Sequence, residues 1–179
     1  MKPNSLRELY LEQLRDLHDA ERQIIKALPK MIDAAQSEEL QDALAEHLDI
    51  TREQAARIER IFKQIGEKPS GEKCKGMQGV IQEGSDLIAE IKNPNVRDAA
   101  IIASAQRVEH YEMAGYGSAR AYAELLGEDD AAQLLQQTLS EEKEADETLT
   151  GLAESINVEA ENEGEEEEAR TPRKTRRVA

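Results

Sequence analysis

Residues 101–119 read Ile-Ile-Ala-Ser-Ala-Gln-Arg-Val-Glu-His-Tyr-Glu-Met-Ala-Gly-Tyr-Gly-Ser-Ala. Small and apolar residues recur here at alternating steps of three and four, as one face of an amphipathic helix requires. Two acids, Glu109 and Glu112, occupy neighbouring positions of that face, where apolar residues are expected. A carboxyl group that faces a core loses its hydration and needs a compensating partner. We therefore expect partners for both acids on neighbouring helices.

Three further long segments show the same spacing, and each is interrupted by polar residues. The first begins after Ser5, the second after a joint near Ser37, and the last follows Gly127. The polar residues on their apolar faces are Glu21 in the first segment, His47, Thr51 and Gln54 in the second, and Glu142 in the last, with Asp146 on its flank. Each long helix therefore contributes at least one acid or histidine.

Local signals mark the helix ends. Ser5 is expected to be an N-cap, because Glu8 follows three residues later in a capping-box pattern. Pro29 is expected to bend the first helix or mark its end. Gly66 and Gly127 supply stop signals after the second and third long helices.

A long, broken segment separates the second and third long helices. Residues 67–95 contain several glycines and prolines and a short apolar repeat that includes Val80 and Ile88. We interpret this segment as a crossover that carries a short helix. Such a link favours a parallel arrangement of the two helices that it joins, because they are connected along the length of the bundle. The sequence predicts an all-α, ferritin-like antiparallel four-helix bundle over residues 1–157.

Composition limits the function classes. The chain has 179 residues, of which 39% are hydrophobic, and this suits a single domain. A formal net charge of -15 disfavours nucleic acid and anionic lipid as partners. No apolar run matches a membrane span or a signal peptide. Cys74 is the only cysteine, so no internal disulfide can form. We expect a cytoplasmic protein that binds neither a membrane nor nucleic acid.

The last residues differ from the rest. Residues 159–168 are nearly all acidic, and residues 170–177 are mostly basic. Such a composition cannot bury enough apolar surface to offset the conformational entropy of the chain. We predict a disordered charged tail over residues 158–179.

The polar positions of the four long helices are expected at a similar depth along the bundle axis. Helices rise about 1.5 Å per residue, and an antiparallel hairpin pairs positions that are equidistant from its turn. Turns near Gln36 and Glu128 place the polar positions of both hairpins at mid-bundle. Several buried carboxylates at one level repel one another unless cations neutralise them or they keep their protons. Carboxylates with an imidazole suit Fe or Mn, and bundle interiors hold such two-metal sites. The predicted ligands of two Fe or Mn ions are Glu21, His47, Glu109, Glu112, Glu142 and Asp146.

Each of these residues also has an ordinary structural explanation. A single acid at the edge of an apolar face, such as Glu21, is commonly a solvated flank residue. A buried histidine such as His47 commonly forms a core hydrogen bond, and Thr51 and Gln54 could bond to each other or to water. The coincidence of level in all four helices favours the metal interpretation.

Five segments resemble the ferritin-like stress proteins of the YciF/YciE type. They are Asp19-Ala-Glu-Arg-Gln23, His47-Leu-Asp-Ile-Thr-Arg-Glu-Gln54, Val96-Arg-Asp-Ala-Ala100, Val108-Glu-His-Tyr-Glu-Met-Ala-Gly-Tyr-Gly117 and Thr138-Leu-Ser-Glu-Glu-Lys143. The resemblance implies a rubrerythrin-like bundle, often dimeric, that is induced under stress and holds a two-metal site. The chain departs from the Glu-x-x-His pattern common in ferritins and rubrerythrins. Ala145 stands three residues after Glu142, where the pattern has histidine, and no acid lies three residues before His47. Ile50 also stands where relatives of this type have a second acid after the histidine.

The main hypothesis is a stress-protective di-metal carboxylate protein that consumes peroxide or dioxygen, which would make it an oxidoreductase of the catalase or peroxidase kind. We expect a homodimer and assign no catalytic residue. Two alternatives stay open. One is an iron-storage protein. The other is a metal-free structural or protein-interaction module, in which the inward acids are protonated or bonded to water.

Overall fold

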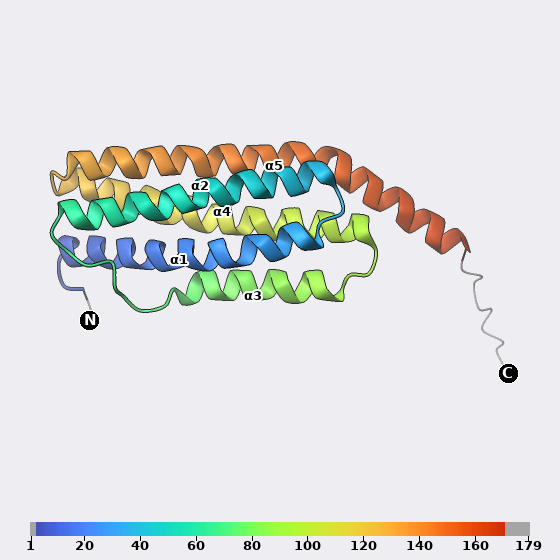
Figure 1. The fold of residues 1–179 in the computed structure, drawn as a ribbon, viewed down its shortest axis with the longest axis horizontal. Helices are drawn as coiled ribbons and strands as arrows, with labels where there is room; N and C mark the ends of the chain where they lie inside the picture. The colour runs from blue at the N-terminus through green and yellow to red at the C-terminus, as the bar shows by residue number, and fades with distance from the viewer. Residues whose placement is uncertain (1–2, 171–179) are drawn as a thin grey trace.

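Five α-helices form the fold of the part of the chain that the structure describes. The computed structural model describes residues 3–170, and this part of the chain contains no β-strand. The helices are α1 (Leu6–Ala34), α2 (Glu38–Gln64), α3 (Lys75–Glu90), α4 (Pro94–Leu125) and α5 (Asp129–Arg170). Figure 1 shows α1, α2, α4 and α5 side by side as a bundle, with the shorter α3 along its outside. The predicted all-α four-helix bundle is confirmed, and so is the short helix in the crossover.

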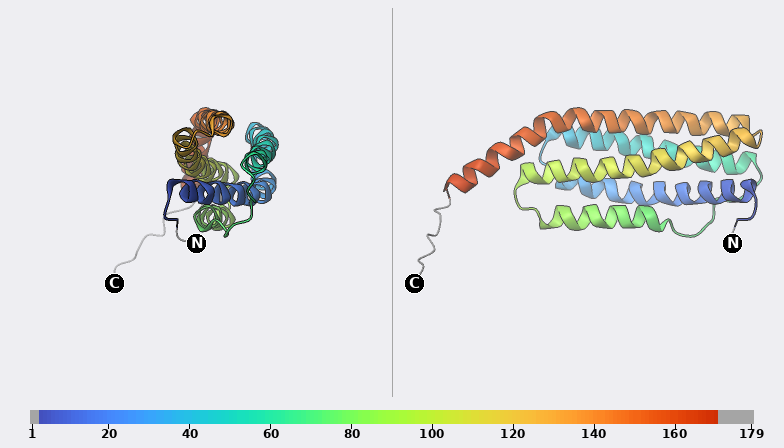
Figure 2. Two further views of the ribbon diagram at one scale, coloured as in Figure 1. Left: turned by 90° about the vertical axis from the view of Figure 1, so that its left-hand side faces the viewer. Right: turned by 180° about the vertical axis from the view of Figure 1, so that it is seen from behind.

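The direction of the chain follows the predicted topology. It reverses between α1 and α2 and again between α4 and α5, so that both hairpins are antiparallel (Figure 1). The link that contains α3 returns the chain along the bundle, and α2 and α4 therefore run in the same direction. Contacts place α1 and α5 each beside both α2 and α4. Figure 2 shows the bundle end-on, with α3 on its outer face next to α1.

The predicted helix-end signals are mostly confirmed. The Ser5 side chain accepts a hydrogen bond of 3.2 Å from the backbone N–H of Glu8. Gly66 and Gly127 follow α2 and α4 with φ angles of +72° and +73°, which other residues rarely adopt. Pro29 does not end α1, which continues to Ala34. The last turn of α1 stays helical because its apolar side chains still pack against the core.

A band of buried polar side chains separates two apolar clusters. One cluster lies toward the α1–α2 turn and includes Ile24, Leu28, Leu44, Ile101, Ile102 and Leu149. The other lies toward the α4–α5 turn and includes Leu14, Leu17, Ile58, Ile61, Tyr116 and Leu135. Between them lie the buried residues that we call the polar layer: Glu21, His47, Thr51, Gln54, Glu109, Glu112, Thr138 and Glu142. The common level inferred from the sequence is thus a real level of the bundle.

Specific contacts hold α3 against the bundle. The backbone N–H of Cys74, the N-cap of α3, donates a hydrogen bond of 2.8 Å to Asp19 on α1. The Tyr111 hydroxyl on α4 donates to Asp16 at 2.8 Å and lies 3.0 Å from the Cys74 sulfur. Gly76 allows this approach, because a Cβ atom there would lie 2.6 Å from the Tyr111 ring. The crossover helix is therefore anchored to both α1 and α4.

The end of α5 extends into the predicted charged tail, whose disorder stays a prediction. The helix continues through Arg170, past the expected boundary at residue 157, and it projects beyond the bundle (Figure 1). Alanine and glutamate are good helix formers, and they extend a helix that packing has already nucleated. Residues 171–179 of the predicted tail lie outside the described residues. Along the described chain, no helix combines the length and apolar character needed to cross a membrane.

Candidate metal centre

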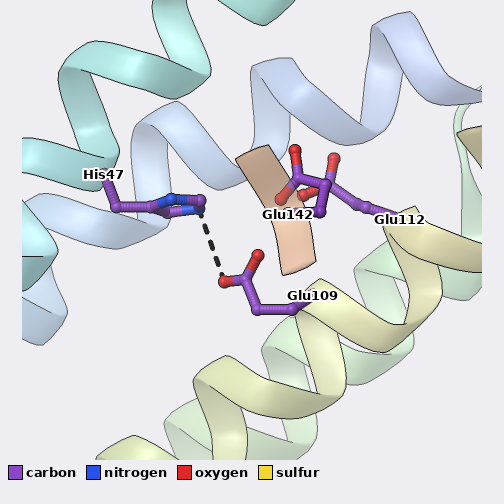
Figure 3. Close-up of side chains that lie close together, drawn as sticks. All are labelled: His47, Glu109, Glu112 and Glu142. Carbon is purple, nitrogen blue, oxygen red and sulfur yellow. Dashed lines mark ion pairs between the residues drawn. The ribbon is translucent and has the colours of Figure 1, made fainter. Parts of the chain in front are cut away.

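Four side chains from three helices meet in the polar layer (Figure 3). His47 comes from α2, Glu109 and Glu112 from α4, and Glu142 from α5. Each residue offers one ligand atom, and these atoms all lie within 4.8 Å of one another. The dashed line in Figure 3 joins His47 Nε2 and Glu109 Oε1, which lie 3.4 Å apart. Glu109 and Glu112 converge because residues three apart share a helix face. This buried cluster could hold a metal ion.

The four side chains are removed from water, and most of their polar atoms lack hydrogen-bond partners. His47 is 7% exposed, Glu109 is 2% exposed, and the other two are fully buried. Atoms without a hydrogen-bond partner in the described structure are both ring nitrogens of His47, Oε2 of Glu109, and both carboxylate oxygens of Glu112 and Glu142. An unsatisfied buried polar atom costs about 1–3 kcal/mol, so a native core rarely keeps so many together. The cluster therefore requires protons or a bound cation.

Burial and crowding shift the pKa values in this cluster. Burial, reinforced by neighbouring carboxylates, raises the pKa of Glu109 and of Glu112 well above the usual value. Burial raises the pKa of Glu142 to about 7. Burial also lowers the pKa of His47 to about 4, so its imidazole is neutral at pH 7 and available as a ligand. Metal binding to such a site would release protons from the carboxyl groups.

Glu21 lies next to the four-residue cluster. It comes from α1 and is fully buried. The Tyr116 hydroxyl donates a hydrogen bond to its Oε1 atom, and Oε2 has no partner in the described structure. Burial, followed by the charge of Glu142, raises the pKa of Glu21 well above its usual value. Glu21 is therefore an inner acid of the polar layer, although it is outside the group that shares ligand distances.

Asp146 lies apart from the cluster. Its Oδ1 atom accepts a hydrogen bond of 3.2 Å from Gln106 and lies 3.5 Å from Nε2 of the exposed His110. Asp146 lies about one helical turn from Glu142 along α5, and its carboxylate contacts these two side chains of α4 instead of the four converging residues. Of the six residues predicted from the sequence, the structure brings His47, Glu109, Glu112 and Glu142 together, places Glu21 beside them, and separates Asp146.

An ion pair that no sequence pattern indicated lies at the edge of the polar layer. Both terminal nitrogens of Arg57 on α2 donate to Glu141 on α5, at 2.6 and 2.7 Å, and one also donates to Thr138 at 2.8 Å. Gln54 donates to the same carboxylate at 3.3 Å. Arg57 stands on the flank beside Ile58, where a charged residue gives no sign of burial. This network joins α2 to α5 next to Glu142.

Two cavities border the cluster, and Glu109 contributes to the wall of both. One has a volume of about 220 Å³, lies between α2 and α5, and also reaches His47. The other has a volume of about 400 Å³ and lies between α1, α3 and α4, with mainly apolar side chains such as Ile24, Val80 and Val108 around it. The candidate centre is therefore buried in the bundle but lies beside space that small molecules or ions can occupy.

Related proteins have the same fold. The solved structure of the Escherichia coli stress protein YciF is 39% identical, with a TM-score of 0.84 over 87% of this chain and 99% of that one. YcfI of Rhodopseudomonas palustris, described as a candidate structural protein, is 46% identical, with a TM-score of 0.80 over 82% of this chain and 94% of that one. A protein of Xanthomonas campestris shares the fold at 19% identity, with a TM-score of 0.73 over 90% of this chain and 99% of that one.

The sequences agree with this structural likeness. Protein YciF of Escherichia coli (strain K12) is 40% identical over 164 residues, which cover 90% of this chain and 99% of YciF. Residues 5–161 match the family described as Domain of unknown function (DUF892). The match includes every residue of the candidate centre. This chain therefore belongs to the DUF892 family and is of the YciF type.

Proposed function

We propose that this protein is a stress-response protein whose buried centre binds two Fe or Mn ions and reacts with peroxide or dioxygen. The observation that carries the proposal is the convergence of His47, Glu109, Glu112 and Glu142 with most of their polar atoms unpartnered. One imidazole and three carboxylates make a donor set that suits these metals, and helical bundles are a common host for such pairs.

The chain's own residues have defined parts in this proposal. His47, Glu109, Glu112 and Glu142 would hold the ions, and Glu21 would supply a further carboxylate whose orientation Tyr116 fixes. Bound redox-active ions would supply the electrons that reduce peroxide or dioxygen. The apolar clusters on both sides of the polar layer exclude water from the centre. In a dry site, each charge interaction is stronger than it is in water.

The stress role rests on relatedness. The Escherichia coli protein with a similar sequence and fold is described as a stress protein. A centre that removes peroxide or dioxygen would protect a stressed cell, and this links the proposed chemistry to the proposed role.

A metal-free structural role is the second candidate. The raised pKa values of Glu21, Glu109 and Glu112 would allow these acids to keep their protons at neutral pH, which would relieve their repulsion without a metal. The related YcfI is described as a candidate structural protein. In this case the polar layer would act only in folding or in the specificity of helix packing.

Metal analysis separates the two candidates. The protein is expressed in medium supplemented with Fe or with Mn, purified, and analysed for bound metal before and after chelation. We expect about two ions per chain, a lower melting temperature after chelation, and peroxide consumption that is strongly reduced in Glu109→Gln and Glu142→Gln. Absence of tightly bound metal, with a melting temperature unchanged by chelation, would favour the structural role. Equal peroxide consumption in parent and variants would rule out a reaction at this centre.

We also propose that the protein acts as a cytoplasmic homodimer. The free and buried thiol of Cys74 is compatible with a reducing compartment. Light scattering on purified protein tests the dimer, and fractionation of the source cells tests the location. A monomer at micromolar concentration would contradict the proposed homodimer. Recovery of the protein outside the cytoplasm would contradict the proposed location.

A further inference from the structure

The cavity between α2 and α5 opens beside the candidate centre. Its volume is about 220 Å³, and its lining residues come from α2, from α5 and, through Glu109, from α4. The buried His47 and Glu109 form its inner part, and three acids line its outer part: Glu46 on α2 and Glu141 and Glu144 on α5. The cavity thus joins exposed carboxylates to two members of the buried cluster.

Two of the three outer acids carry an uncompensated charge. The charge of Glu141 is neutralised by its bidentate ion pair with Arg57. Glu46 and Glu144 are exposed, and neither forms an ion pair with another described side chain. Together they give the mouth of the cavity a negative potential, which raises the local concentration of cations and disfavours anions.

The inner part of the cavity presents a free ligand. Both ring nitrogens of His47 lack a hydrogen-bond partner in the described structure, although the side chain is more than nine-tenths buried. Figure 3 shows this ring directed toward Glu109, with Glu112 and Glu142 across the centre from His47. A cation that passes the outer acids would therefore meet an imidazole and a carboxylate before it reaches the rest of the cluster.

The second cavity makes a poor route for ions. It reaches Glu109 from the opposite side, and apolar side chains such as Leu28, Ile81 and Ile88 surround it. Its basic lining residues, Lys30 and Arg97, would repel a cation. The two approaches to Glu109 thus differ in both polarity and charge.

We propose that the cavity between α2 and α5 is the uptake route for divalent metal ions, with Glu46 and Glu144 as outer, transient ligands. This inference rests on the proposed function, because it assumes that the buried cluster is the destination. Outer carboxylates of this kind speed the capture of a cation without contributing to its final coordination. Their removal should change the rate of metal binding and leave the final metal content unchanged.

Rapid mixing of metal-free, full-length protein with Co²⁺ tests the route, because the visible absorbance of Co²⁺ changes when it enters a protein site. The test variant carries Glu46→Gln and Glu144→Gln. The control variant carries Glu39→Gln and Glu147→Gln, which remove the same charge from α2 and α5 outside the cavity lining. At low salt we expect the test variant to bind Co²⁺ about three- to tenfold more slowly than the parent, and the control to bind at nearly the parental rate.

The salt dependence of the binding rate and the final Co²⁺ content provide two further tests of the route. Added salt should slow the parent and the control and have a smaller effect on the test variant, since screening acts on the charges that the substitutions remove. Equal rates in parent and test variant would overturn the uptake route and leave the proposed function standing. A lower final Co²⁺ content in the test variant would make Glu46 or Glu144 a permanent ligand and would also overturn the route. Failure of the parent itself to bind Co²⁺ would overturn the proposed function together with the route.

Discussion

The hydroxyl group of Tyr116 on α4 donates a hydrogen bond to the carboxyl group of Glu21 on α1, across the interior of the bundle. Both side chains are fully buried. The bond satisfies one oxygen of Glu21 and fixes its direction, while the other oxygen has no partner in the described structure. Tyr116 therefore determines how the acid from α1 faces the acids from α4 and α5.

Replacement of Tyr116 by phenylalanine should destabilise the metal-free protein. The substitution leaves a buried carboxyl group without its donor, which costs about 1–3 kcal/mol of unfolding free energy. Urea denaturation of the metal-free protein measures this loss. Tyr10→Phe is the matched control, because Tyr10 is equally buried but its hydroxyl has no hydrogen-bond partner in the described structure. Equal stability of the two variants would contradict a structural role for the Tyr116 bond.

Glu112→Gln and Asp146→Asn should differ in their effect on metal binding. Glu112 belongs to the group of converging ligand atoms, whereas Asp146 contacts Gln106 and His110 outside it. We expect the Glu112 variant to bind Mn²⁺ or Co²⁺ at least about tenfold more weakly than the parent, and the Asp146 variant to bind as the parent does. Titration of metal-free protein with either ion measures both affinities. A tenfold loss in Asp146→Asn would restore this residue as a ligand.

The level of the polar layer was predictable because it depends on regular geometry. Helix rise is constant, and the turns that join α1 to α2 and α4 to α5 are short. Counting from these turns therefore placed the polar positions of both hairpins at mid-bundle without knowledge of the packing. The spacing of Glu109 and Glu112 was sufficient to put both on one face.

Features that depend on helix rotation or on distant contacts were not predictable. Asp146 lies close to the apolar face of α5 in a helical projection, and only the packing against α4 shows that it faces away from the cluster. Asp98 accepts backbone hydrogen bonds of 2.8 Å from both Gln36 and Ser37 and so holds the start of α2. No local pattern connects residues that are about sixty positions apart.

Gly76→Ala and Gly79→Ala should have opposite effects, although both lie in α3. A Cβ atom at Gly76 would lie 2.6 Å from the Tyr111 ring, whereas a Cβ atom at Gly79 would meet nothing within 4 Å. We expect Gly76→Ala to lower the unfolding free energy by about 1–3 kcal/mol, because the clash displaces α3. Gly79→Ala should raise it by about 0.5–1 kcal/mol through better helix propensity.

Chemical and thermal unfolding of the two variants measures this difference, and the thiol of Cys74 reports on its cause. Cys74 is fully buried at the start of α3, and burial raises the pKa of its thiol. Both effects should make alkylation slow in the parent and in Gly79→Ala. Displacement of α3 should make it faster in Gly76→Ala. Parental reactivity in a destabilised Gly76→Ala variant would show that the clash is relieved elsewhere.

The buried acids also predict how the stability of metal-free protein depends on pH. Unfolding free energy falls with rising pH wherever the folded state binds more protons than the unfolded state. Glu142, with a pKa raised from 4.5 to about 7, meets this condition, as do Glu21, Glu109 and Glu112, whose pKa values are also raised. His47 acts in the opposite sense, because its pKa is lowered from 6.5 to about 4, but its contribution is constant above pH 6.5.

Metal-free protein should therefore become less stable as the pH rises above 6.5, and Glu142→Gln should weaken this trend. Each unit of pKa shift corresponds to about 1.4 kcal/mol, so the glutamine variant should exceed the parent in stability by on the order of 1–3 kcal/mol near pH 8. Urea denaturation in the presence of a chelator at several pH values measures both effects, with the exposed Glu154→Gln as control. Saturating Mn²⁺ should remove the trend in the parent, because bound cations replace the protons. Stability that is flat or rises between pH 6.5 and about 8.5 would show that the buried acids are already neutralised by other means. The repulsion between these acids would then no longer support the metal-binding proposal.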